Sequence, residues 1–163
     1  MAETAASPRA SHVLMAGTYL IGIIGAFIGF MALSSGADAA LMRISAVLAV
    51  GVPGLLSFVR HAVFNRSDAV AGGWDYGQVN NFQIEVGLAN LAWGVFAILA
   101  VLLDWGTQAI AASFLISGFY FAAVAVFVIV TRDFRNRRIG GLIGIVMWGA
   151  INIWLGWGFM AMA

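Results

Sequence analysis

Long apolar runs alternate with short polar connections along the whole chain. Five such runs occupy residues 13–33, 41–64, 82–103, 108–131 and 139–160. A helix needs about 20 apolar residues to cross the hydrocarbon core, and its backbone polar groups must be satisfied within the segment. None of the runs alternates with the period of a membrane β-strand. The pattern therefore predicts an all-α fold, an integral membrane bundle of five transmembrane helices.

The connections between these runs are short, which places successive helices side by side and antiparallel. We expect residues 13–163 to form a single transmembrane helical domain. Residues 1–12 are small and polar, and we expect them to form a mobile N-terminal tail.

The arginines indicate how the bundle is oriented. All eight basic residues are arginines. With five spans, one side of the membrane carries Arg9, Arg60, Arg66, Arg132, Arg135, Arg137 and Arg138. Arg43 alone falls on the other side. Positive residues favour the cytoplasmic side, so the N-terminus is predicted to be cytoplasmic in a multi-pass protein of a bacterial inner membrane.

Composition argues against several classes of function. The chain is 63% hydrophobic and only 9% charged, whereas soluble domains carry about 25% charged residues. Most of its surface must therefore face the lipid bilayer. A net charge of +1 without a basic stripe gives no nucleic-acid signal. The absence of cysteine, of nucleotide and hydrolase motifs and of paired span histidines leads us to expect no cofactor and no metal.

The third run has three distinct faces when it is projected at 100° per residue. One face carries Gln83, Gly87, Asn90, Gly94 and Ala97. The nearly opposite face carries Glu85, Ala89, Ala92 and Phe96. The arc between them carries Ile84, Leu88, Leu91, Val95 and Ile98. Only this arc suits lipid, so we expect the helix to lie centrally and to contact protein on its other two faces.

Polar residues near one end of the bundle form the candidate site. Glu85 is the only acidic residue inside an apolar run, where a carboxylate is costly without a partner. Arg60 and His61 end the second run at the same side of the membrane, close to Gln83. We predict an Arg60–Glu85 contact, or a short link through His61 or Gln83. Asn90 lies deeper, and its amide is expected to form a hydrogen bond across helices.

Three interpretations of this site are open. It is a buried ion pair that holds two helices together, a ligand, proton or headgroup site, or a metal site. The metal interpretation is the weakest, because the chain has only two histidines and His12 lies in the tail.

Small residues and one proline predict how the helices pack. Gly25 and Gly29 lie one turn apart in the first run, as do Gly140 and Gly144 in the fifth. Such pairs allow membrane helices to approach closely. Pro53 removes a backbone donor from the second run and predicts a kink there.

The segment from Phe58 to Ala97 resembles an uncharacterised family of small bacterial multi-pass membrane proteins, known as a domain of unknown function. Its motif is Phe-Gln-x-Glu-Val-Gly-x-Ala-Asn-Leu, which this chain matches at residues 82–91. The usual family run begins with Ser-Pro, where this chain has Asn80 and Asn81. The resemblance implies that Arg60, His61, Gln83, Glu85 and Asn90 belong to one shared site, and it implies no activity.

Two other classes of function compete with a leading hypothesis. The leading hypothesis is a non-enzymatic accessory or scaffolding subunit, which acts within a larger membrane complex or as a homo-oligomer. The first alternative is a small transporter or proton-conducting protein that uses Glu85. The second is a membrane protein that binds a lipid or a quinone near Arg60 and His61.

Overall fold

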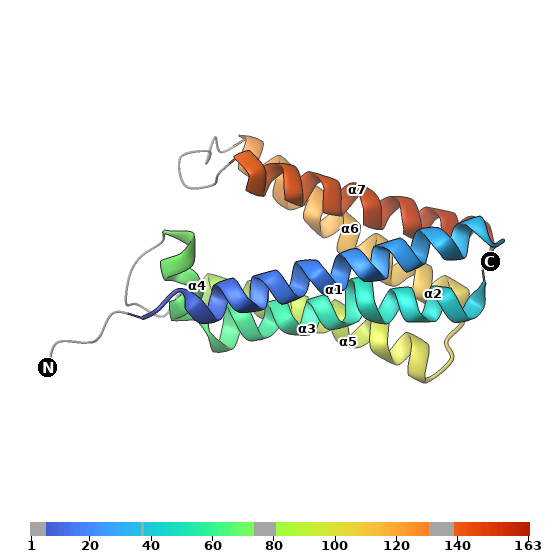
Figure 1. Cartoon of the computed structure of the whole chain (residues 1–163), viewed down its shortest axis with the longest axis horizontal. Helices are drawn as coiled ribbons and strands as arrows, with labels where there is room; N and C mark the ends of the chain where they lie inside the picture. Colours follow the sequence, from blue (N-terminus) through green and yellow to red (C-terminus); the bar gives the residue numbers. More distant parts are fainter. Residues whose placement is uncertain (1–5, 37, 74–80, 131–138) are drawn as a thin grey trace, which may run out of the picture.

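The computed structural model describes residues 6–36, 38–73, 81–130 and 139–163, apart from the side chain of Ile139, and these form a helical bundle (Figure 1). Five helical segments are long and apolar enough to cross a membrane. They are α1 (Arg9–Ser34), a composite second span (Ala39–Val63), α5 (Asn81–Leu102), α6 (Thr107–Val130) and α7 (Ile139–Ala161). The described residues contain no strand, so the predicted all-α fold and the five predicted spans are confirmed.

The second span is one continuous stretch of four segments. It consists of α2 (Ala39–Ala46), the π-helical turn η1 (Val47–Gly51), α3 (Val52–Phe58) and a second π-helical turn η2 (Val59–Val63). The first π turn ends at Gly51, two residues before Pro53, which cannot donate a backbone hydrogen bond. The irregularity predicted at this proline thus takes the form of a widened turn.

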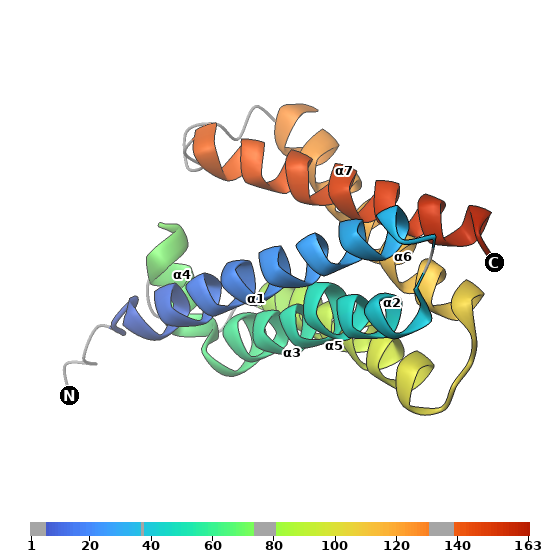
Figure 2. The same ribbon diagram turned by 45° about the vertical axis from the view of Figure 1, so that its right-hand side comes forward.

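The helices fall into two groups. In both ribbon views, α1, the second span and α5 lie together, while α6 and α7 form a hairpin along one side (Figures 1 and 2). The hairpin lies close to the C-terminal end of α1 and diverges from α1 toward the end where the chain begins.

Glycines bring the helices of each group together. A Cβ added at Gly54 of α3 would lie 2.7 Å from the Cα of Gly94 on α5. One added at Gly156 of α7 would lie 3.0 Å from the carbonyl oxygen of Ala111 on α6. Gly25 of α1 likewise sits directly against the backbone of the second span. The close approaches predicted from small residues are therefore present at these positions.

The pair Gly140 and Gly144 is an exception to that prediction. Among the described residues, nothing lies within 4 Å of a Cβ added at Gly140, and the nearest atom to one at Gly144 is the Tyr19 hydroxyl at 4.0 Å. The first half of α7 diverges from α1, so this glycine pair is not used inside the bundle.

Candidate functional site

The short helix α4 (Asn65–Gly72) follows the second span and carries Asp68 into the end of the bundle. The Asp68 residue is only 7% exposed. Its carboxylate receives side chains from three other elements, namely α1, η2 and α5. We call the set Ser11, Arg60, His61, Asp68 and Gln83 the Asp68 cluster.

Hydrogen-bond donors surround both carboxylate oxygens of Asp68. The Ser11 hydroxyl donates to Oδ1 at 2.6 Å, and Arg60 Nε lies 3.4 Å from the same oxygen. His61 Nδ1 and the Gln83 side-chain nitrogen lie 2.7 Å and 2.6 Å from Oδ2. The hydrogen bonds from Ser11, His61 and Gln83 go to an ionised acceptor, and such bonds are about twice as strong as neutral ones, whereas Arg60 contributes an ion pair. The cluster therefore ties four elements together at one point.

The partners of His61 define its protonation state. Arg60 Nη2 lies 2.6 Å from His61 Nε2, and a guanidinium can only donate. Nε2 must therefore accept this hydrogen bond, which leaves the proton on Nδ1, where it is donated to Asp68. The geometry fits a neutral imidazole that connects Arg60 to the carboxylate.

Asp68 remains ionised despite its burial. Burial alone would raise the pKa of Asp68. The hydrogen bond from His61 and the positive charge of Arg60 outweigh burial, so the pKa falls from 3.8 to about 2. The cluster at neutral pH thus contains one carboxylate and one guanidinium, each with hydrogen-bonded neighbours.

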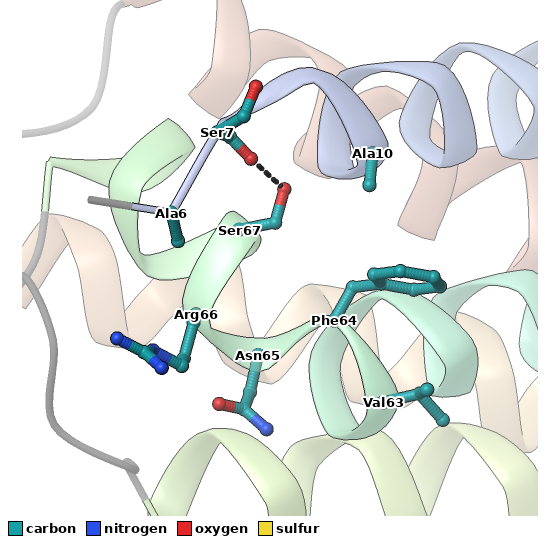
Figure 3. Close-up of a pocket in the computed structure, with 8 residues that line it drawn as sticks. All are labelled: Ala6, Ser7, Ala10, Val63, Phe64, Asn65, Arg66 and Ser67. Atoms are coloured by element: carbon teal, nitrogen blue, oxygen red, sulfur yellow. Dashed lines mark hydrogen bonds between the residues drawn. The ribbon is translucent and has the colours of Figure 1, made fainter. Parts of the chain in front are cut away.

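Three serines connect the start of α1 and the residue Ser7 before it to α4. The Ser11 backbone N–H donates to Ser67 Oγ at 3.1 Å, and the Ser67 hydroxyl donates to the Ser7 carbonyl oxygen at 2.7 Å (Figure 3). The helix begins at Arg9, and Ser11 is buried. This part of the expected tail of residues 1–12 is therefore ordered in the structure, because it supplies a ligand to the Asp68 cluster.

Three of the predicted site residues do come together, but on a different carboxylate. Arg60, His61 and Gln83 meet at Asp68. The predicted Arg60–Glu85 contact is wrong, because Glu85 is exposed and has no hydrogen bond or ion pair within the described part of the chain. Positions 83 and 85 are about 200° apart on a helix, so only one of them can point toward η2.

Asn90 also differs from the expectation. It is buried, with 4% of its surface exposed, but its side-chain nitrogen donates to the Val86 carbonyl oxygen of the same helix at 2.6 Å. The polar face of α5 is otherwise as predicted. All of its residues are buried, namely Gln83, Gly87, Asn90, Gly94 and Ala97. The opposite face is only partly covered, because Glu85 and Ala92 are exposed whereas Ala89 packs against the core.

Sequence reasoning missed Asp68 and Ser11 as the centre of the site. Asp68 lies in what the hydropathy pattern indicates as a polar connection, and Ser11 in the expected tail. The sequence offered one signal for a buried Asp68. The stretch Asn65–Gly72 is compatible with a short helix, and in it Asp68 precedes small apolar residues. Asn80, which stands where the usual family run has Ser-Pro, lies outside the described residues. Within the described ranges, no three His, Cys, Asp or Glu side chains form a group that could hold a metal.

The fold and this site define a helical multi-pass membrane protein with a buried polar cluster at one end of the bundle. The chain belongs to DUF6790, a family of unknown function, whose profile matches residues 12–162. No curated protein and no solved structure matches the chain.

Proposed function

We propose that the protein is a non-enzymatic accessory or scaffolding subunit of a membrane complex. We further propose that it resides in a bacterial inner membrane with its N-terminus in the cytoplasm. The arginine distribution supports this orientation. The Asp68 cluster also lies at the same end of the bundle as the start of α1, which contributes Ser11.

The open glycine face at the start of α7 carries this proposal. Gly149 and Gly156, in the second half of α7, lie against the α6 backbone. Gly140 and Gly144, in the first half, have no such neighbour among the described residues. In lipid, small residues promote helix association because backbones can approach closely. The first half of α7 therefore offers a surface that a helix of another chain can pack against.

The Asp68 cluster supports a structural role rather than chemistry. Its carboxylate accepts hydrogen bonds from Ser11, His61 and Gln83 and pairs with Arg60. These contacts occupy the acceptor positions that a substrate or a transferred proton would need. The cluster joins α1, the second span, α4 and α5, which keeps the bundle rigid while α7 presents its open face.

Purification in mild detergent tests the proposal. The wild-type chain, tagged and expressed at native level, is expected to elute in a complex whose protein mass, with the bound detergent subtracted, exceeds 17.2 kDa. Gly144→Leu places a bulky side chain on the open face and is expected to release the chain from that complex. The released chain should keep its fold, because no tight internal contact is lost.

Ala123→Leu provides a matched control, since Ala123 is an exposed small residue of α6. It makes the same kind of change on a different lipid-facing surface and should leave the complex intact. Recovery of the wild-type chain only as a lone monomer would contradict the proposal. Equal effects of Gly144→Leu and Ala123→Leu would contradict the assignment of the α7 face.

A further inference from the structure

An apolar groove of about 340 Å³ lies between α1 and α7. Both helices begin at the same end of the bundle and diverge toward that end (Figures 1 and 2). The residues that line the groove lie between Tyr19 and Phe30 on α1 and between Gly144 and Ile151 on α7. The hydroxyl of Tyr19 and the indole nitrogen of Trp148 are the only polar side-chain groups among them. The groove is therefore a site for a largely apolar molecule.

The groove has the width of one hydrocarbon chain. Its wall on α1 runs from Tyr19 to Phe30, which is about 16 Å at a rise of 1.5 Å per residue. A volume of about 340 Å³ spread over that length gives a cross-section of about 20 Å². Carbon atoms in contact are about 3.5–4.0 Å apart, so this cross-section holds one extended chain and not two. A helix with its side chains is about 10–12 Å wide, so a helix of another chain can cover the groove but cannot enter it.

The Tyr19 hydroxyl reaches from α1 across the groove to α7. It lies 4.0 Å from the position of a Cβ added at Gly144, and no other described atom lies that close to this position. Tyr19 is 45% exposed, and its hydroxyl has no hydrogen-bond partner among the residues that the structure describes. The hydroxyl is therefore a free donor in the space that Gly144, which has no side chain, leaves open.

This hydroxyl lies inside the hydrocarbon and not at the level of the headgroups. Gly144 comes five residues after Ile139, where α7 begins, and this corresponds to a depth of about 7–8 Å. The ester carbonyls of phospholipids lie in the interfacial region outside the hydrocarbon core, and a hydrogen bond spans only about 3 Å. A hydroxyl without a partner in hydrocarbon is unfavourable. The groove therefore favours a ligand that brings a neutral acceptor to this depth.

From these observations we propose that the groove binds one lipid-soluble quinone. A ring carbonyl accepts a hydrogen bond from Tyr19, and the isoprenoid chain lies along Phe27 and Phe30. A quinone is neutral, carries carbonyl acceptors and has one long chain, whereas a phospholipid has two chains and a charged headgroup. The site is separate from the Asp68 cluster. It does not depend on the accessory role proposed above, because a single chain contains the whole groove.

Native mass spectrometry of the purified full chain in detergent tests this site. Decylubiquinone is titrated against phenyldecane, which has a ring and the same chain but no carbonyl, each at the same mole fraction in the micelle. The wild-type chain is expected to bind decylubiquinone at least about threefold more tightly. Tyr19→Phe removes only the hydroxyl. It should weaken decylubiquinone binding about threefold to tenfold and leave phenyldecane binding unchanged.

Two further variants control for the space in the groove. Gly144→Leu fills the groove beside Tyr19 and should abolish the binding of both compounds. Gly141→Leu is the matched control, because Gly141 is exposed, does not line the groove and has nothing described within 4 Å of an added Cβ. It should bind both compounds as the wild type does. Circular dichroism before each titration shows whether the variants keep the helical fold, and Tyr19→Phe is expected to keep it because its hydroxyl has no internal hydrogen bond to lose.

The wild-type comparison decides the proposal even if a variant fails to fold. Equal wild-type affinities for decylubiquinone and phenyldecane would overturn it, as would equal decylubiquinone affinities of the wild type and a folded Tyr19→Phe. Displacement of decylubiquinone by didecanoyl phosphatidylcholine at the same mole fraction would show that the groove takes ordinary acyl chains and not a quinone. An equal loss of binding in Gly141→Leu and Gly144→Leu would place the ligand outside this groove. Failure of the accessory role would leave all of these results unchanged, because the titrations use the purified chain alone.

Discussion

Replacing Asp68 by asparagine is the sharpest test of the cluster that holds the bundle together. The change keeps the shape of the side chain but removes its charge and one acceptor. Ser11, His61, Gln83 and Arg60 all present donors to the carboxylate. An amide nitrogen cannot accept a hydrogen bond from any of them. At least one of these donors would therefore face the new amide nitrogen, which is itself a donor.

The expected loss of stability in Asp68→Asn follows from the burial of the ion pair. The side chains of Arg60 and Asp68 are 18% and 10% exposed, so the ion pair is largely withdrawn from water. Removing one partner of a buried pair costs roughly 3–5 kcal/mol, and the partial exposure of Arg60 favours the lower end, about 3 kcal/mol. For a chain of this size, that loss corresponds to a melting temperature lowered by about 6–12 °C.

Thermal unfolding in detergent, followed by circular dichroism, measures this shift. Asp104→Asn is the matched control, because Asp104 pairs with Arg43 at the other end of the bundle and its side chain is 69% exposed. Exposed ion pairs contribute less than about 1 kcal/mol, so the control should melt within a few degrees of the wild type. Similar melting temperatures for Asp68→Asn and Asp104→Asn would refute the view that the cluster stabilises the bundle.

Three further predictions concern pH, packing and orientation. Because the pKa of Asp68 is lowered from 3.8 to about 2 in the folded chain, the cluster should contribute about 2 kcal/mol above pH 4 and lose it as the pH falls toward 2. Acid titration of the wild type against Asp68→Asn checks this, and parallel acid curves would contradict it. Gly87→Val should lower the melting temperature, because a Cβ at Gly87 already lies 2.9 Å from the Ala62 Cβ, whereas Gly141→Val, with nothing described within 4 Å, should have little effect. Equal melting temperatures for the two variants would show that the close approach of α5 to η2 does not contribute to stability. Because the chain has no cysteine, Asn81→Cys and Ala163→Cys can be labelled one at a time with an impermeant thiol reagent on intact cells. We expect labelling only at Ala163→Cys, and the reverse pattern would overturn the cytoplasmic N-terminus.

Hydropathy predicted the architecture because the bilayer restricts what an apolar run can do. Each run predicted as a span is a helix in the structure, since the backbone must satisfy its own hydrogen bonds in lipid. The polar face of α5 was also predictable. Gln83 and Gly87 point inward at helical spacing, and Gly87 lets η2 approach closely enough to bring His61 beside Gln83.

The partner of Arg60 was not predictable from hydropathy. Glu85 stood out because it interrupts an apolar run, whereas Asp68 looked like an ordinary residue of a polar connection. The choice between them depends on the η2 turn and on how α4 folds back, which are tertiary features. Burial of Asp68 is possible only because four donors from three other elements, α1, η2 and α5, surround it.

Three positions of the motif at residues 82–91 have a structural explanation. Gln83 binds Asp68, Gly87 allows a close helix approach, and the Asn90 amide is satisfied within α5. Glu85 has no such internal role, because it faces outward from the bundle.

Photo-crosslinking in intact cells tests the proposed accessory role most directly. A photoreactive residue is introduced at Gly144, on the open face of α7, and in parallel at Ala123 on α6. The proposed role predicts a discrete protein adduct from position 144 and none from position 123. Absence of any protein adduct from position 144, with both variants folded and inserted, would contradict it.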